Sequence, residues 1–189
     1  MVHVFIGPPP DNHKTMHPRL PSIAPFAHLG WAFVVLLTGG WVDQAQGQAL
    51  PDVSLKDIQG NVVSTAASLQ EEGPTVFCFW ATWCSPCKRE LNNYAELYDD
   101  WVDETGVKIV AVSIDDQRSV NRVAPYVNSV GWEYDILLDP NRDLARALNV
   151  QNVPHTFVVD AQGNVVWSHN NYAEGDEYEL YEELLKLAE

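Results

Sequence analysis

The stretch Trp80-Ala-Thr-Trp-Cys-Ser-Pro-Cys-Lys-Arg-Glu-Leu91 decides the fold of this chain. It continues an apolar, β-branched and aromatic run over residues 75–80, which predicts a strand buried on both faces. From Pro86 onward, apolar residues recur every three or four positions, which predicts a helix. Cys84 and Cys87 therefore lie where a buried strand turns into a helix, and a C-x-x-C pair in that place indicates redox chemistry.

The positions of the two cysteines predict different roles for them. Cys84 lies at the predicted helix start, where unpaired backbone N–H groups and the helix dipole favour a thiolate. Lys88 and Arg89 follow in the next turn and add positive potential. We therefore expect Cys84 to be the attacking thiolate and Cys87, one helical turn later, to be the resolving thiol.

Two other uses of the cysteine pair stay open on the residues alone. A structural disulfide fits an exported protein, although closing so short a loop constrains the unfolded chain little. A tetrahedral metal site needs further ligands, and in the absence of a second C-x-x-C only His155 and His169 are candidates. The sequence implies no cofactor.

The rest of residues 50–189 alternates between strand and helix patterns. Turn signals at Gln59-Gly60-Asn61 and Ala161-Gln-Gly163 predict hairpins, the first of them near the N-terminal end of this region. The order predicts an α/β fold with a central mixed sheet and helices on both faces. Further strands are predicted over 107–114, 134–138, 155–160 and 164–168, and further helices over 117–130, 142–148 and 176–188. In the last helix we expect Tyr178 on the packed face and Glu177 on a solvated acidic face.

Two separate motifs resemble the thioredoxin superfamily. They are Phe79-Trp80-Ala81 leading into Trp83-Cys84-Ser85-Pro86-Cys87, and the distant pair Val153-Pro154. The sequence is most similar to the TlpA/ResA-like thiol–disulfide oxidoreductases, because Lys88-Arg89-Glu90 follows the motif and a strand–helix element is inserted within 107–139. The resemblance implies a thioredoxin-like domain over residues 50–189, a cis bond before Pro154, and Pro154 packed beside the cysteine pair.

Three residues near the motifs have more than one interpretation. Cys78 stands where thioredoxin carries a buried Asp, and we expect an inert buried thiol, with a third redox thiol as the alternative. Glu90 is similar to a glutamate used near the active site of ResA-like proteins, but it also suits the first turns of a helix. His155 is either a group that contacts the thiolate or a partly exposed strand residue.

Residues 1–49 have a different composition from the rest. Lys14 and Arg19 precede an uncharged stretch over 20–42, and small residues follow up to Ala49. This order is typical of a secretory signal peptide, with a retained membrane anchor as the alternative. We expect cleavage after Gly47 or Ala49, a natural start at either Met1 or Met16, and a protein that is periplasmic or anchored facing outside the cytoplasm.

The charge excludes several classes of partner. The 189 residues carry 11 Lys+Arg against 26 Asp+Glu, a formal net charge of −15. Nucleic acids and anionic lipid surfaces attract basic proteins, so neither is expected as a partner. Three cysteines are too few for a framework of several disulfides, so the fold depends on its hydrophobic core.

The expected activity is thiol–disulfide exchange through Cys84 and Cys87 by way of a mixed disulfide. The resemblance implies a reductase of protein disulfides, as in cytochrome c maturation, with a membrane thiol–disulfide electron donor; we expect a monomer. The sequence does not fix the reduction potential, so an oxidase or an isomerase stays open. One alternative is a thiol peroxidase, although peroxidases of the peroxiredoxin type carry Thr where this chain has Ala81. Another is a copper-binding or copper-delivery module that uses the same thiols.

Overall fold

The computed structural model describes residues 47–188. Its strands form one mixed sheet of seven strands in the order β2-β1-β5-β4-β3-β6-β7. Strands β3, β4 and β5 are parallel to one another, and β6 runs antiparallel to β3. An antiparallel hairpin forms each edge. The strands are β1 (Ser54–Asp57), β2 (Val62–Ser64), β3 (Thr75–Trp80), β4 (Lys108–Ser113), β5 (Asp135–Leu138), β6 (His155–Val159) and β7 (Val165–Asn170).

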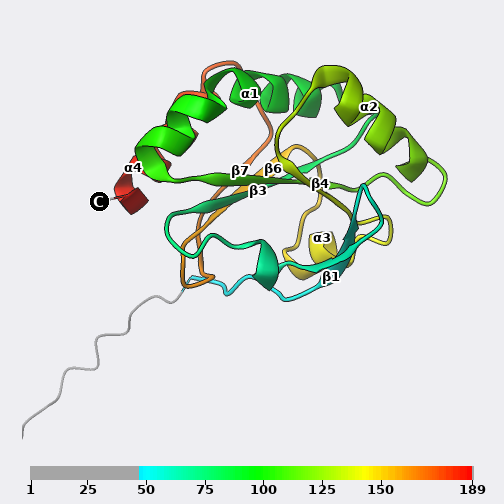
Figure 1. The fold of residues 1–189 in the computed structure, drawn as a ribbon, viewed down its shortest axis with the longest axis horizontal. Coiled ribbons are helices and arrows are strands. Elements are labelled where there is room, and N and C mark those ends of the chain that lie inside the picture. The colour runs from blue at the N-terminus through cyan, green and yellow to red at the C-terminus, as the bar shows by residue number, and fades with distance from the viewer. Residues whose placement is uncertain (1–46, 189) are drawn as a thin grey trace, which may run out of the picture. The chain divides into compact units, whose positions relative to one another are not determined.

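Helices cover both faces of this sheet (Figure 1). The long helix α1 (Ser85–Thr105) lies on one face together with α2 (Val123–Val130) and α4 (Asp176–Ala188), and α3 (Asp143–Ala147) lies on the other. Two short 3-10 helices, η1 (Ala66–Ser68) and η2 (Val120–Arg122), complete the described chain. The predicted α/β fold with a mixed sheet, helices on both faces and an N-terminal hairpin is confirmed.

The central strand β3 has all six of its residues buried, as the apolar run predicts. It is hydrogen-bonded to β4 on one side and to β6 on the other. Because β3, β4 and β5 are parallel, the segments that follow them emerge at one edge of the sheet, where α/β proteins build their sites. Cys84, Asp115 and Asp139 come shortly after these three strands, respectively.

Aromatic side chains pack between the sheet and the helices that cover it. Trp80 at the end of β3 lies 4.9 Å from Trp132 and 5.7 Å from Tyr126, measured between ring centroids. The Trp132 indole N–H donates to Asn92, and the Tyr134 hydroxyl donates to the Leu91 carbonyl, so α1 is bound to this cluster by polar contacts as well. Helix α1 ends at Gly106, whose φ of 66° lies in the left-handed region that glycine adopts readily.

The second predicted helix begins later than its pattern indicates. It was expected from residue 117, but α2 begins at Val123 after the short η2. The reason is a turn in which the Asp116 carboxylate accepts from the backbone N–H groups of Arg118 and Ser119. An aspartate that bonds to nearby backbone in this way favours a turn over a helix.

The packed face of α4 differs from the predicted one. Tyr178 is 66% exposed, whereas Glu177, expected in solvent, is buried together with Leu180 and Leu184. The Glu177 carboxylate accepts from the Tyr172 hydroxyl and from the Gly175 backbone N–H, which offsets the cost of its burial. The prediction of a wholly solvated acidic face is therefore wrong at Glu177.

The predicted leader over residues 1–49 lies outside the described residues except for its last three. Gln48 and Leu50 pair through their backbone with Val165 and Gly163 at the β6–β7 turn. In the described part of the chain, no helix combines the length and the apolar character that crossing a membrane requires. Cleavage and anchoring stay predictions.

Candidate active site

Cys84 and Cys87 form a disulfide at the N-terminus of α1, as the motif predicts. Cys84 is the N-cap residue of the helix, and its Sγ accepts a hydrogen bond of 3.3 Å from the Cys87 backbone N–H. Pro86 stands in the first turn, where a missing N–H leaves no carbonyl unpaired. The two cysteines are nearly inaccessible, while Trp83 beside them is 62% exposed.

The bond between Val153 and Pro154 is cis, as the resemblance implies. Pro154 is buried, and the Val153 carbonyl oxygen lies 3.7 Å from Cys84 Sγ. The Pro154 carbonyl accepts from the Asn171 N–H, which joins this loop to the end of β7. Cys84 and Val153 are 69 residues apart in the sequence, and the fold brings them into contact at the sulfur of Cys84.

Asp115 is a site residue that the sequence reasoning missed. It is fully buried after β4, and its carboxylate accepts from both the backbone N–H and the hydroxyl of Thr82, at 2.7 and 2.6 Å. The Ser113 hydroxyl donates to the same carboxylate. These contacts fix the loop between β3 and Cys84. The one available signal was an Asp directly after an apolar run at the carboxyl edge of the sheet.

Glu90 lies on the buried face of α1, one turn after Cys87, and is 1% exposed. Its Oε1 accepts from the Thr156 hydroxyl at 2.9 Å and from the Tyr94 hydroxyl at 3.1 Å, while Oε2 is buried with no protein partner. Burial raises the pKa of this carboxyl to about 8, although the hydrogen bonds from Thr156 and Tyr94 act in the opposite direction. Near neutral pH the group can therefore take up or release a proton.

Cys78 is a free, fully buried thiol in the middle of β3. Burial, and then the nearby carboxylate of Glu90, raise its thiol pKa well above the ordinary value. A buried neutral thiol is a poor nucleophile, so this environment favours the inert interpretation of Cys78.

The two histidines of the β6–β7 hairpin have contacts away from the disulfide. His155 stacks on Phe157 with ring centroids 4.3 Å apart, and its Nδ1 is 3.3 Å from the Asn170 side chain. His169 Nε2 lies 3.2 Å from an Asp176 carboxylate oxygen. Burial lowers the pKa of His155, and His169 acts in the same direction. Over residues 47–188, no group of three or more His, Cys, Asp or Glu side chains is placed to hold a metal ion.

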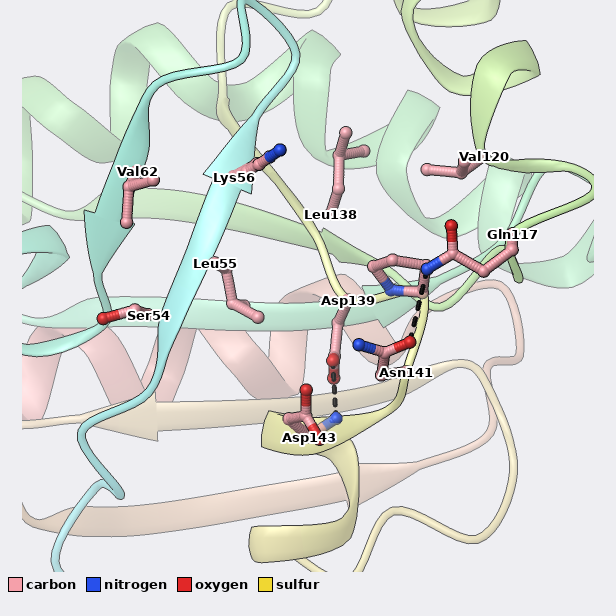
Figure 2. Close-up of a pocket in the computed structure, with 11 residues that line it drawn as sticks. Ser54, Leu55, Lys56, Val62, Gln117, Val120, Leu138, Asp139, Asn141 and Asp143 are labelled. Atoms are coloured by element: carbon pink, nitrogen blue, oxygen red, sulfur yellow. Dashed lines mark hydrogen bonds between the residues drawn. The ribbon is translucent and has the colours of Figure 1, made fainter.

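A pocket of about 470 Å³ lies beside β1 (Figure 2). Figure 2 shows the Asp139 carboxylate accepting from the Asp143 backbone N–H, and the Gln117 side chain donating to that of Asn141. None of Cys84, Cys87, Glu90 and Pro154 lines it.

Comparisons with known proteins agree with this geometry. A profile of the AhpC/TSA family matches residues 46–168. The thiol–disulfide oxidoreductase ResA of Bacillus subtilis (strain 168) is 30% identical over 139 residues, which cover 73% of this chain and 74% of that protein. The solution structure of a thioredoxin-like protein from Porphyromonas gingivalis is 45% identical, covers 75% of this chain and 94% of that one, and has a TM-score of 0.65.

A further similar structure is that of an isomerase. The crystal structure of a thio-disulfide isomerase from Thermus thermophilus is 32% identical, covers 76% of this chain and 98% of that one, and has a TM-score of 0.59. The chain belongs to the AhpC/TSA family. Within it, the cysteine pair, the cis-proline and the ResA relatives make this protein a thioredoxin-like thiol–disulfide oxidoreductase.

Proposed function

We propose that this protein is an exported reductase of protein disulfides that works through a mixed disulfide. The observation that carries the proposal is the Cys84–Cys87 disulfide at a helix N-terminus, with the cis-proline loop in contact with Cys84 Sγ. Unpaired N–H groups at that terminus stabilise negative charge on the first sulfur, so Cys84 is the attacking group.

The exchange takes two steps that balance in atoms and electrons. In the first, the Cys84 thiolate attacks one sulfur of the substrate disulfide, forms a mixed disulfide and releases the other substrate sulfur as a thiolate. In the second, the Cys87 thiolate attacks Cys84 Sγ, the mixed bond breaks, and the second substrate sulfur leaves. The substrate disulfide gains two electrons, and the protein is left with the Cys84–Cys87 disulfide that the structure holds.

Glu90 supplies the proton handling that the second step requires. Cys87 must lose its proton before it attacks, and residues three apart on a helix are neighbours on one face. Glu90 stands three residues after Cys87 on the buried face of α1. Its pKa of about 8 means that its ionised form, which becomes more populated as the pH rises toward 8, can accept that proton. Pro154 acts as a positioning residue, since it is buried directly after Val153, whose carbonyl lies against Cys84.

Two single substitutions test the mechanism by insulin reduction. Cys84→Ser is expected to abolish the activity, and Cys87→Ser is expected to accumulate a mixed disulfide that reducing agent releases. Cys78→Ser is the matched control, because it removes a thiol outside the exchanging pair. Full activity of Cys84→Ser would contradict the mechanism.

The direction, donor and location are also part of the proposal. The leader-like residues 1–49 support export, and the similarity to the thiol–disulfide oxidoreductase ResA supports thiol–disulfide exchange. The reducing direction is part of our proposal. A membrane thiol–disulfide donor and a role in cytochrome c maturation follow as the setting of such a reductase, and the protein acts as a monomer. A redox titration of the pair against glutathione and dithiothreitol tests the direction, since a low potential is expected of a reductase and a high one of an oxidase or isomerase.

A thiol peroxidase is the second candidate, favoured by the family match alone. Ala81, three residues before Cys84, has no hydroxyl, and the hydroxyl of the neighbouring Thr82 donates to Asp115. Rapid oxidation of the reduced protein by hydrogen peroxide, with turnover, would favour the peroxidase over the reductase. Stoichiometric tight binding of Cu(I) by the reduced protein would instead favour the copper module.

A further inference from the structure

The lysines and arginines of this acidic chain differ in whether they pair with a carboxylate. Lys108, Arg146 and Lys186 each pair with a carboxylate, and the Arg142 guanidinium donates to the Val150 carbonyl. In the described residues, five other cationic side chains form no ion pair with a carboxylate. They are Lys56, Lys88, Arg89, Arg118 and Arg122.

Four of these five cations follow the carboxyl ends of β3 and β4. Lys88 and Arg89 are in the first turns of α1 beside the disulfide, and Arg118 and Arg122 are in the connection between β4 and α2. Lys88 is half-buried and the other three are exposed. Since β3 and β4 are parallel neighbours, both segments emerge at the same edge of the sheet. We call these four residues the cationic rim.

The two segments of the cationic rim are joined by direct contacts. The Lys88 Nζ lies 5.3 Å from the centroid of the Tyr126 ring, so α1 and α2 approach each other here. Asp115, at the start of the β4–α2 connection, accepts both hydrogen bonds from Thr82 in the loop that carries Cys84. The rim is therefore fixed relative to the disulfide.

The turn that carries Arg118 is fixed as well. The Asp116 carboxylate accepts from the Ser119 hydroxyl and from the N–H groups of Arg118 and Ser119. These bonds, with Arg118 as a smaller cause, lower the pKa of Asp116, so it stays charged and offsets part of the positive potential. Glu174 is a second carboxylate nearby, since it lines the same pocket as Arg89. The cationic rim therefore has four cationic side chains and these two exposed carboxylates, so its local charge is positive although the net charge of the chain is −15.

We propose that the partner presents its disulfide within an acidic segment, which the cationic rim binds while Cys84 attacks. This inference rests on the proposed reductase function and names the chemistry of its substrate. Opposite charge beside a reactive group speeds productive encounter by about 10- to 1,000-fold at low ionic strength, and like charge on the rest of the surface opposes binding elsewhere. The expected occupant is thus a protein segment with Asp or Glu next to its cysteines.

The test uses three synthetic peptides with one internal disulfide, flanked by Asp and Glu, by Ser and Asn, or by Lys. The measured quantity is the second-order rate constant for their reduction by the reduced protein. At low salt, the acidic peptide is expected to react about tenfold faster than the neutral one and the basic peptide more slowly. The difference is expected to shrink toward nothing at high salt, because ions screen exposed charges.

A pair of double variants separates the cationic rim from overall charge. Arg118→Glu/Arg122→Glu is expected to abolish the preference for the acidic peptide, measured as the ratio of its rate constant to that of the neutral peptide with the same variant. Arg146→Glu/Lys186→Glu makes the same change in net charge on α3 and at the end of α4, and is expected to retain the preference. Exposed ion pairs contribute little stability, so the control variant is expected to fold.

The outcomes distinguish this inference from the function on which it rests. If no peptide is reduced, the proposed reductase function fails. If the three peptides react equally at low salt, or both double variants lose the preference equally, the reductase stands and the cationic rim is not a docking surface. A third outcome concerns self-association. If the wild type shows no preference among the peptides, and sedimentation shows that it self-associates whereas Arg118→Glu/Arg122→Glu does not, the cationic rim binds a second copy of this chain and not an acidic partner.

Discussion

Replacing Glu90 by Gln tests whether this carboxyl is protonated in the folded protein near neutral pH. Gln keeps an oxygen that accepts from Thr156 and Tyr94 but removes the ionisable group. Burial raises the pKa of Glu90 from its ordinary value of 4.5 to about 8. Over the interval between these values, the folded protein binds more protons at Glu90 than the unfolded chain does.

The sign of the effect follows from this difference in bound protons. A carboxyl whose pKa rises on folding has its full contribution to stability below its unfolded pKa and loses it as the pH rises through its folded pKa. With the two values above, the free energy of unfolding falls by roughly 3 kcal/mol between about pH 5 and about pH 7.5. Glu90→Gln is expected to lack this fall. From about pH 5 to about pH 7.5, its free energy of unfolding should therefore rise relative to that of the wild type by roughly 3 kcal/mol.

Urea unfolding of the oxidised protein over this pH range measures the difference. The range ends below the pH at which Cys78 ionises in the unfolded chain, so the free thiol does not contribute. Glu96→Gln is the matched control, because it makes the same charge change at an exposed position of α1. If the free energy of unfolding of Glu90→Gln falls with pH as steeply as that of the wild type, Glu90 is charged in the folded protein and our account of its environment is wrong.

Three further predictions concern a buried thiol, a buried carboxylate and a helix C-terminus. Cys78→Ala is expected to retain insulin reduction, and the oxidised wild type is expected to show a thiol that reacts with Ellman's reagent only after unfolding; a reactive thiol in the folded protein would reject the inert interpretation. Asp115→Asn removes the charged acceptor of the two Thr82 hydrogen bonds, so we expect the free energy of unfolding to fall by about 1–3 kcal/mol and the rate of insulin reduction to fall with it. Gly106→Ala places a side chain at φ 66° and is expected to lower thermal stability by about 1 kcal/mol, measured by calorimetry.

Local sequence patterns were sufficient for most of the fold. The run over residues 75–80 became β3 with the predicted bounds, and the last helix covers 176–188 as predicted. Its packed face was misplaced, because Glu177 was read as solvated. Its burial depends on the Tyr172 hydroxyl and the Gly175 N–H in the preceding loop, which a helical pattern does not reveal.

The site shows the same limit at a larger separation along the chain. Cys84 and Cys87 carry their signal in their own spacing, and Val153-Pro154 was identified through a family resemblance. Asp115 had only a weak local signal, its place directly after an apolar run, since its role arises only when β3 and β4 pair in register and bring it to Thr82. A contact between segments that meet only through the sheet cannot be predicted from the pattern of either segment.

The burial of Glu90 could have been predicted from the helical pattern. Once Cys87, Leu91 and Tyr94 face the sheet, position 90 must face it too, because residues three and four apart share a face. The same burial is a cost to stability: a carboxyl with one oxygen unpartnered and a pKa of about 8 lowers the free energy of unfolding as the pH rises toward neutrality. An apolar side chain would avoid this cost. A group that costs stability in the pH range where a thiol must lose its proton supports the role in proton transfer proposed for Glu90.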